Sequence, residues 1–338
     1  MSGSLAAQLA TYLSRSWGEP VTIEGLARIS GGASRETYRF DAVMPSGRRL
    51  LIARRDPRGS LIETDRRSEF LALKSFHGQG IAAPEPLILE EEGAELERPF
   101  FIMARVDGGR TASPFQPNAY APHEAQLGLD FFGALGRIAR ADPATLPIAE
   151  ACEAPPLDGC WKRELEYWAG VIEEDELHPQ PIVRAAIRWL RRNPPPPAQK
   201  ISVVHGDYRS GNFLHDGEGK MIAVLDWEMV HLGDPLEDLG WAMDPLWRHG
   251  ATDDTVAGML PKAEAIRVWE EASGLKLDPA AFVWWELFAS VKGQAIWISS
   301  AKEYRVGGYV EPILGFSGWV TARQQDEILA AKLIEVAG

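Results

Sequence analysis

The residues best suited to chemistry lie in one stretch of the chain, residues 201–241, which reads ISVVHGDYRSGNFLHDGEGKMIAVLDWEMVHLGDPLEDLGW. Asp207 follows an apolar run, Asn212 comes five residues later, and Asp226 ends a second apolar run. This order of an acid, an asparagine and a second acid is typical of a kinase catalytic loop. There the first acid receives or orients the acceptor hydroxyl, and the other two groups hold Mg²⁺ on the nucleotide phosphates. The spacing therefore predicts phosphoryl transfer.

Each of these residues taken alone has a plainer interpretation. Single Asp and Asn residues in loops usually form turns or cap helices, and Gly206, Gly211 and Gly217 fit ordinary turns. That interpretation does not account for two acids and an amide at this spacing beside β-rich runs. Phosphoryl transfer is therefore the hypothesis that the structural context must support.

The first hundred residues have the pattern of a small lobe that covers a nucleotide. We expect a leading helix from about residue 5, strands over 21–53, a helix over 67–80, and strands over 82–89 and 99–104. Residues 106–109 contain two glycines and are the expected hinge. We therefore expect a nucleotide-covering lobe over residues 1–104 and a catalytic and substrate-binding lobe over 105–338.

The second lobe is expected to be mainly helical. The apolar periodicity predicts helices over 124–139, 161–172, 182–190, 261–271, 279–304 and 312–336. Residues 111–122 are polar and irregular, which indicates a loop near the site. The aromatic residues of the later helices, such as Trp269, Trp284, Trp285, Phe288 and Trp297, are expected in the core rather than against a cofactor.

Three features of the first lobe are ambiguous on their own. Glycines in the turn at 30–34 let backbone N–H groups approach a phosphate, but the turn also fits an ordinary hairpin loop. Arg54 ends the third strand, where a kinase places its phosphate-pairing lysine, although a charge at a strand end is commonly just solvated. Glu69 lies early in the following helix, where it either pairs with Arg54 or favours the helix N-terminus.

The composition sets broad limits on the protein. The 338 residues are 45% hydrophobic and 25% charged, which fits a globular protein of two lobes. A net charge of −13 disfavours nonspecific nucleic-acid binding. Cys152 and Cys160 have no partner pair at zinc-ligand spacing and are expected as free thiols. No secretory leader or membrane span is expected, so we predict a cytoplasmic location; the oligomeric state is left open.

The motifs together carry a resemblance to a known family. VVHGDYRSGNFL at 203–214, AVLDWE at 223–228 and LGDPLEDLGW at 232–241 resemble the aminoglycoside phosphotransferase-like (phosphotransferase enzyme) family, whose members are small-molecule kinases. Weaker matches earlier in the chain, such as SGGASRETYRF and FFIMARVDGGR, occur in the order that the family has. The resemblance therefore covers about 29–297. Within the family, the chain most resembles the kinase-like domains fused to some acyl-CoA dehydrogenases.

The resemblance implies an α+β, two-lobed protein-kinase-like fold and an ATP- and Mg²⁺-dependent phosphotransferase acting on a hydroxyl of a small molecule. Asp207 would be the catalytic base, Arg209 would offset charge on the phosphoryl group, and Asn212 and Asp226 would bind Mg²⁺. His205 would brace the loop by hydrogen bonding. The implied nucleotide contacts are Arg54 held by Glu69, the loop of Gly31, Gly32, Ala33 and Ser34, and the backbone of Met103, Ala104, Arg105 and Val106.

Two departures from the family pattern keep alternatives open. Arg54 stands where most kinases have lysine, and the glycine loop is short, so a nucleotide-binding pseudokinase with a regulatory role is the main alternative. A metallohydrolase is a further alternative, which would act without ATP through His205, Asp207, Asp226, His231 and Asp234. The acceptor cannot be identified from these residues, and the family name does not establish antibiotic resistance.

Overall fold

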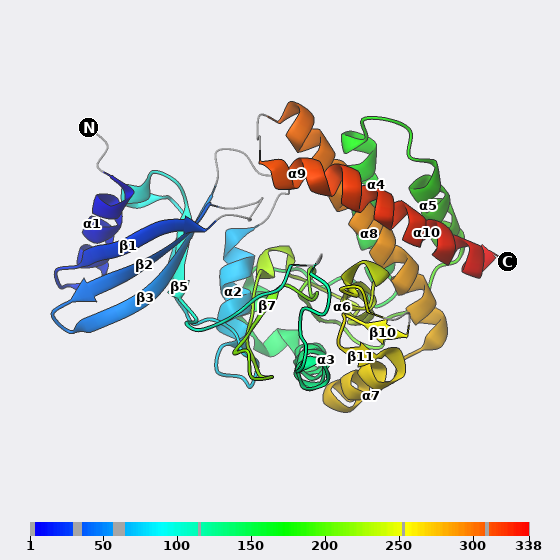
Figure 1. Ribbon diagram of the computed structural model, residues 1–338, viewed down its shortest axis with the longest axis horizontal. Coiled ribbons are helices and arrows are strands. Elements are labelled where there is room, and N and C mark those ends of the chain that lie inside the picture. The colour runs from blue at the N-terminus through cyan, green and yellow to red at the C-terminus, as the bar shows by residue number, and fades with distance from the viewer. Residues whose placement is uncertain are drawn as a thin grey trace.

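The computed structural model describes residues 4–29, 36–56, 65–113, 116–251, 254–307 and 311–337 of the chain. It has two lobes, one built on an antiparallel sheet and one mainly of helices (Figure 1). The expected α+β, two-lobed architecture is therefore confirmed. The sheet of the first lobe has the strand order β1-β2-β3-β5-β4. Its strands are β1 (Thr22–Ile29), β2 (Glu36–Met44), β3 (Gly47–Arg55), β4 (Pro86–Glu90) and β5 (Phe100–Ala104).

The first helix, α1 (Leu5–Trp17), covers part of this sheet. Ser4 accepts a hydrogen bond from the backbone N–H of Ala7, and Gly18 ends the helix in a left-handed conformation. Leu9 and Leu13 are fully buried in a cluster that includes Phe40 of β2 and Phe100 of β5. The apolar stripe read from the sequence therefore packs the helix against the sheet.

The second helix, α2 (Arg66–Phe76), links the sheet to the helical lobe. Asp65 caps its N-terminus by accepting hydrogen bonds from the backbone N–H groups of Arg67 and Ser68. Leu73 and Phe76 are buried in the core of the large lobe. Because one face is fixed by this packing, Glu69 in the first turn is held toward the end of β3.

The helical lobe follows the order expected from the sequence. Its α-helices are α3 (Glu124–Arg140), α4 (Cys160–Asp175), α5 (Pro181–Arg192), α6 (Leu236–Ala242), α7 (Lys262–Ser273), α8 (Pro279–Val306), α9 (Pro312–Phe316) and α10 (Ala322–Ala337). A π-helical turn at Ser317–Thr321 joins α9 to α10, so the single helical region expected at 312–336 is interrupted there. None of the described helices is both long and apolar enough to cross a membrane.

Short strand pairs carry the loops with the candidate chemistry. Strands β6 (Ser202–Val204) and β9 (His231–Gly233) pair antiparallel, as do β7 (Phe213–His215) and β8 (Met221–Val224). A further short pair, β10 (Thr255–Val256) and β11 (Leu260–Pro261), lies beside α7. The catalytic-loop candidates lie between β6 and β7, and Asp226 lies just beyond β8. Residues far apart in the sequence are therefore brought to one edge of the lobe.

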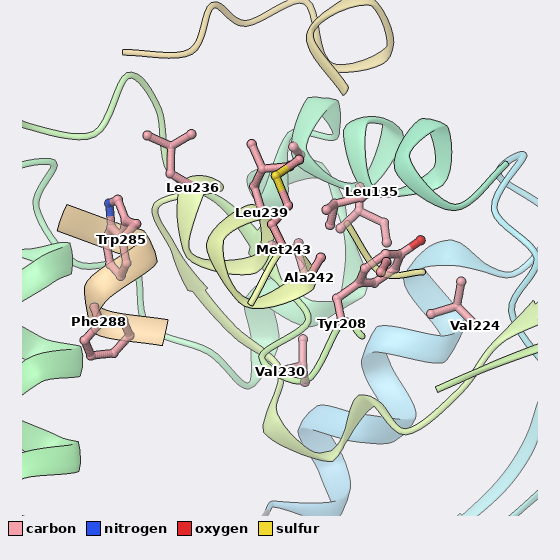
Figure 2. Close-up of a cluster of buried hydrophobic side chains, with 14 of the residues drawn as sticks. Leu135, Tyr208, Val224, Val230, Leu236, Leu239, Ala242, Met243, Trp285 and Phe288 are labelled. Atoms are coloured by element: carbon pink, nitrogen blue, oxygen red, sulfur yellow. The ribbon is translucent and has the colours of Figure 1, made fainter. Parts of the chain in front are cut away.

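The buried core of the helical lobe packs against the loops that follow β6 and β8. Figure 2 shows Leu239 of α6 and Met243, which directly follows α6, in the same buried cluster as Trp285 and Phe288 of α8, with Tyr208 of the loop after β6 nearby. The hydroxyl of Tyr208 donates a hydrogen bond to the carbonyl of Phe131 on α3 (2.7 Å), which ties the loop to that core. The predicted core tryptophans Trp269, Trp284 and Trp285 are buried, whereas Trp297 is only partly buried.

Candidate active site

The loop after β6 is held in place by a carboxylate beneath it. Asp238 of α6 accepts hydrogen bonds from the backbone N–H groups of His205 (2.6 Å) and Gly206 (2.9 Å). Gly206 has a φ of 84°, and a Cβ at this position would lie 2.3 Å from the carbonyl oxygen of Met229. Only glycine fits this turn without displacing its neighbour. The His-Gly-Asp sequence is thus explained by backbone geometry as well as by chemistry.

Asp207 is anchored by three side chains. Its Oδ1 accepts hydrogen bonds from the indole N–H of Trp241 (2.8 Å) and from Nε of Arg209 (3.2 Å), and its Oδ2 accepts one from Nδ2 of Asn212 (2.6 Å). Burial raises the pKa of Asp207, which the positive charge of Arg209 opposes. These hydrogen bonds orient both carboxylate oxygens of Asp207, and its burial increases the proton affinity of the carboxylate.

Asn212 connects Asp207 to the second acidic residue. Its Nδ2 donates to the backbone carbonyl of Asp207 (3.0 Å) as well as to Oδ2, so its amide oxygen is directed away from both. The backbone carbonyl of Asn212 accepts the N–H of Leu225 (2.8 Å), the residue before Asp226. This contact fixes the distance between the two loops that carry the predicted metal ligands.

Arg54 lies at the centre of a group of three carboxylates. Its Nη1 contacts Oε1 of Glu69 at 2.7 Å, both terminal nitrogens contact Oδ1 of Asp226 at 3.0 Å, and Nη2 contacts Oε2 of Glu228 at 2.9 Å. The predicted pair between Arg54 and Glu69 is therefore present. Although burial by itself raises the pKa of Asp226, the charge and hydrogen bonds of Arg54 hold it below its usual value.

This group fits a metal–nucleotide ligand in three respects. Three carboxylates gather around one guanidinium, and the side chain of Asp226, 35% exposed, is the most accessible of the three. Mg²⁺ prefers oxygen ligands such as the Asp226 carboxylate and the Asn212 amide oxygen. The buried Nε of Arg54 has no acceptor among the described residues, and a phosphate oxygen would supply one.

His205 braces the loop, as the sequence predicts. Its Nε2 lies 2.9 Å from the carbonyl of Leu225, and its Nδ1 accepts the backbone N–H of Asp207. Burial lowers the pKa of His205 to about 4, so the ring is neutral and does not exchange protons near pH 7. The ring also packs on Trp227, which stacks on Phe76 of α2. This column of rings connects the catalytic loop with the helix that carries Glu69.

The remaining predicted nucleotide contacts fall into two groups. Gly31, Gly32, Ala33 and Ser34 lie outside the described residues. Residues 103–106 lead from β5 toward the helical lobe, and the backbone N–H groups of Ala104 and Arg105 already donate within the first lobe, to Glu85 and Leu50. Within the described part of the chain, the N–H of Val106 has no backbone acceptor. It is therefore a donor that the backbone of the described residues leaves unused.

The residues proposed for a metallohydrolase are not gathered into one cluster. Both ring nitrogens of His205 are used by the backbone, and Asp234 accepts the backbone N–H of Leu236 and the indole N–H of Trp285. Across the described ranges, the group of three or more His, Cys, Asp or Glu side chains whose ligand atoms lie close together is Glu164, His231 and Glu237. The ammonium of Lys292, 2.8 Å from Glu237, already places a positive charge there.

Several residues of the site were not predicted from the sequence. Glu228 carries a detectable signal, since it is an acid two residues after Asp226 in a chain whose β3 residue is arginine rather than lysine. Asp238 and Trp241 lie in the motif LGDPLEDLGW at 232–241, but the sequence alone indicates no role for either residue. Their contacts with the catalytic loop depend on the packing of α6, which short-range sequence patterns do not specify.

Comparison with known proteins identifies a family. A family model described as the phosphotransferase enzyme family matches residues 25–275. Among curated proteins, acyl-CoA dehydrogenase family member 11 of Gallus gallus is 26% identical over 245 residues, which are 71% of this chain and 30% of that protein. Acyl-CoA dehydrogenase family member 10 of Mus musculus is 26% identical over 226 residues, 64% of this chain and 20% of that protein. The chain thus spans under a third of these relatives.

Solved structures share the fold at low sequence identity. A Ralstonia eutropha protein assigned as an aminoglycoside phosphotransferase has a TM-score of 0.73 and 21% identity, with 97% of this chain and 98% of that chain covered. Aminoglycoside phosphotransferase APH(4)-Ia, in a complex with ADP and hygromycin B, has a TM-score of 0.59 and 16% identity, with 98% and 99% covered. The two-lobed kinase-like fold therefore extends over nearly the whole chain.

Proposed function

Because the chain belongs to the phosphotransferase enzyme family, we propose that it is an ATP-dependent kinase that transfers the γ-phosphoryl group to a hydroxyl of a small molecule. The observation that carries the proposal is the convergence of Asp207, Asn212 and Asp226 from two loops beside Arg54. In this proposal, residues 1–104 cover the nucleotide, and residues 105–338 supply the catalytic groups and bind the acceptor.

The nucleotide and its metal would be held by groups from both lobes. The carboxylate of Asp226 and the amide oxygen of Asn212 would bind Mg²⁺, Arg54 would contact the phosphates, and the N–H of Val106 would contact the adenine. When bound, Mg·ATP supplies the phosphoryl group together with the cation that neutralises its oxygens. The chain contributes position and charge, which account for most of the catalysis in this class of reaction.

Asp207 would receive or orient the acceptor hydroxyl. Its two oxygens are fixed by Trp241, Arg209 and Asn212, so the acceptor meets a carboxylate that does not need to reorganise. The burial that raises its pKa also strengthens its hydrogen bond to a hydroxyl proton. The guanidinium of Arg209 lies over the ring of Trp247 with its carbon 4.8 Å from the ring centroid, which keeps its charge beside Asp207.

The contact between Arg54 and Asp226 favours a second candidate function. An arginine that holds the metal-binding acid is also what a catalytically weak, nucleotide-binding regulator would contain. The acceptor-facing Asp207 argues for the kinase, because a protein that only binds nucleotide does not need an acid that receives or orients an acceptor hydroxyl. The second function predicts nucleotide binding without acceptor-dependent turnover.

An acceptor screen separates the two functions. The purified chain is mixed with ATP, Mg²⁺ and a panel of hydroxylated small molecules, and ADP formation is followed by a coupled assay. The kinase predicts ADP formation that requires one class of acceptor and stops when EDTA replaces Mg²⁺. Nucleotide binding with no ADP formation over the whole panel would favour the regulatory function instead.

A further inference from the structure

The contacts of Arg54 differ between its two terminal nitrogens. Nη1 contacts Glu69 and Asp226, whereas Nη2 contacts Asp226 and Glu228. A lysine at this position would present a single nitrogen, for which Glu69 and Asp226 would suffice. The arginine fork has a second nitrogen, and Glu228 is its second partner.

The local backbone explains how Glu228 reaches this nitrogen. Asp226 has a φ of 66°, a left-handed conformation, and the following residues form the turn Trp227–Met229. This geometry brings the carboxylates of Asp226 and Glu228, two residues apart, to the same guanidinium. The turn is fixed by Trp227, which is fully buried and donates its indole N–H to the carbonyl of Val224. Glu228 is therefore presented by a rigid element.

The three carboxylates differ in their access to solvent. The side chain of Asp226 is 35% exposed, whereas those of Glu69 and Glu228 are 2% and 12% exposed. Every described hydrogen bond of Asp226 with Arg54 uses Oδ1. Asp226 is thus the carboxylate that an incoming cation can reach, while Glu69 and Glu228 stay beneath the guanidinium.

We propose that Glu228 is a positioning residue that holds Arg54 at the phosphates after Asp226 has turned to the metal. This inference rests on the proposed function. With Asp226 engaged elsewhere, each terminal nitrogen of Arg54 still keeps one carboxylate, Glu69 on Nη1 and Glu228 on Nη2. The guanidinium then keeps its plane, and Nε, which has no acceptor among the described residues, can face a phosphate oxygen. Glu228 is in this way the group that makes arginine an effective substitute for lysine.

A double-mutant cycle tests the inference without any need for turnover. The variants are Glu228→Gln, Arg54→Lys and the two together, and the readout is the Kd for the nonhydrolysable analogue AMP-PNP with Mg²⁺, measured by calorimetry. Glu228→Gln keeps an oxygen acceptor but removes the negative charge that strengthens the hydrogen bond from Arg54, so we expect it to raise the Kd about tenfold when Arg54 is present. In the Arg54→Lys background, we expect the same substitution to change the Kd less than about twofold.

Two controls distinguish positioning from a general structural role. Glu286→Gln removes a carboxylate from a pair with Lys262 in the helical lobe, away from the nucleotide, and should leave the Kd unchanged. Thermal stability of each nucleotide-free variant is measured in parallel. A structural role for Glu228 would lower affinity equally in both backgrounds, and that result would overturn the inference while leaving the kinase proposal intact. A wild-type chain that does not bind AMP-PNP with Mg²⁺ would overturn both.

Discussion

The buried pair between Glu237 and Lys292 provides a test of how the site is supported. Their side chains are each 1% exposed, and Lys292 Nζ lies 2.8 Å from Glu237 Oε1, so α6 is joined to α8 inside the core. Although burial by itself lowers the pKa of Lys292, the charge of Glu237 raises it, and the pair is ionised. Because α6 also carries Asp238 and Trp241, which contact the catalytic loop, loss of this pair should reach the site.

The expected effect of Lys292→Met follows from the geometry. At 2.8 Å and an effective dielectric constant of about 20, the attraction between the two charges is about 6 kcal/mol. Burying two charges opposes most of this attraction, so the pair as a whole adds little. Removing Lys292, however, leaves the carboxylates of Glu164 and Glu237 with His231 as the cation between them, so one buried negative charge is not balanced within this group. We therefore expect Lys292→Met to lower the free energy of unfolding by about 3–5 kcal/mol.

Urea unfolding of four chains tests this expectation. Lys276→Met removes an exposed lysine that pairs with Glu270 at the same 2.8 Å separation and should change the stability by less than about 1 kcal/mol. The double variant Glu237→Gln with Lys292→Met removes both charges and should recover part of the loss seen with Lys292→Met alone. The reasoning is refuted if Lys292→Met is as stable as Lys276→Met, or if the double variant is no more stable than the single one.

Two further predictions concern charge in and around the site. Asp207→Ala should abolish acceptor-dependent ADP formation while the Kd for Mg·ATP stays within about threefold of wild type, since Asp207 faces the acceptor; full turnover would show that another group receives the hydroxyl proton. Although burial by itself lowers the pKa of His231, Glu164 and Glu237 raise it from 6.5 to about 9. Its protonation therefore stabilises the fold fully below pH 6.5, and this contribution, about 3 kcal/mol, is lost as the pH rises through 9. Urea unfolding at pH 6.5 and 9.5 should show this loss in the wild type and not in His231→Gln. An equal change in the free energy of unfolding between the two pH values in both proteins would contradict the prediction.

Much of the fold and site could be predicted from the sequence because the signals are local. The apolar stripes of α1, α2 and α3 and the acid-asparagine-acid spacing after β6 and β8 depend on neighbours a few residues apart. The pair of Arg54 with Glu69 was one of two interpretations of the local sequence, and the family resemblance favoured it. In each case one helix or strand places the side chain.

The rest depends on packing between distant elements. The π-helical turn at Ser317–Thr321 contains Gly318 and the β-branched Val320 and Thr321, which are weak helix formers, but such residues alone do not specify a π-helical turn. No local pattern assigns a role to Lys292, whereas the structure pairs it with Glu237 and places its ammonium over Trp168 and Trp241. The contact between Arg54 and Glu228 joins residues 174 positions apart, and no periodicity specifies it. Such contacts appear only when the lobes are assembled.

The central claim is that Asp226 and Asn212 form a metal-dependent nucleotide site. It is tested most directly by calorimetric titration of ATP into the purified chain with Mg²⁺ or with EDTA, for the wild type and for Asp226→Ala. Asp158→Ala, which removes an exposed carboxylate before α4, is the matched control. We expect Mg²⁺ to strengthen ATP binding by tenfold or more in the wild type and in the control, which is about the contribution of one charge-assisted contact. In Asp226→Ala we expect Mg²⁺ not to strengthen ATP binding. Equal ATP affinity with Mg²⁺ and with EDTA, or full Mg²⁺ dependence in Asp226→Ala, would contradict the account.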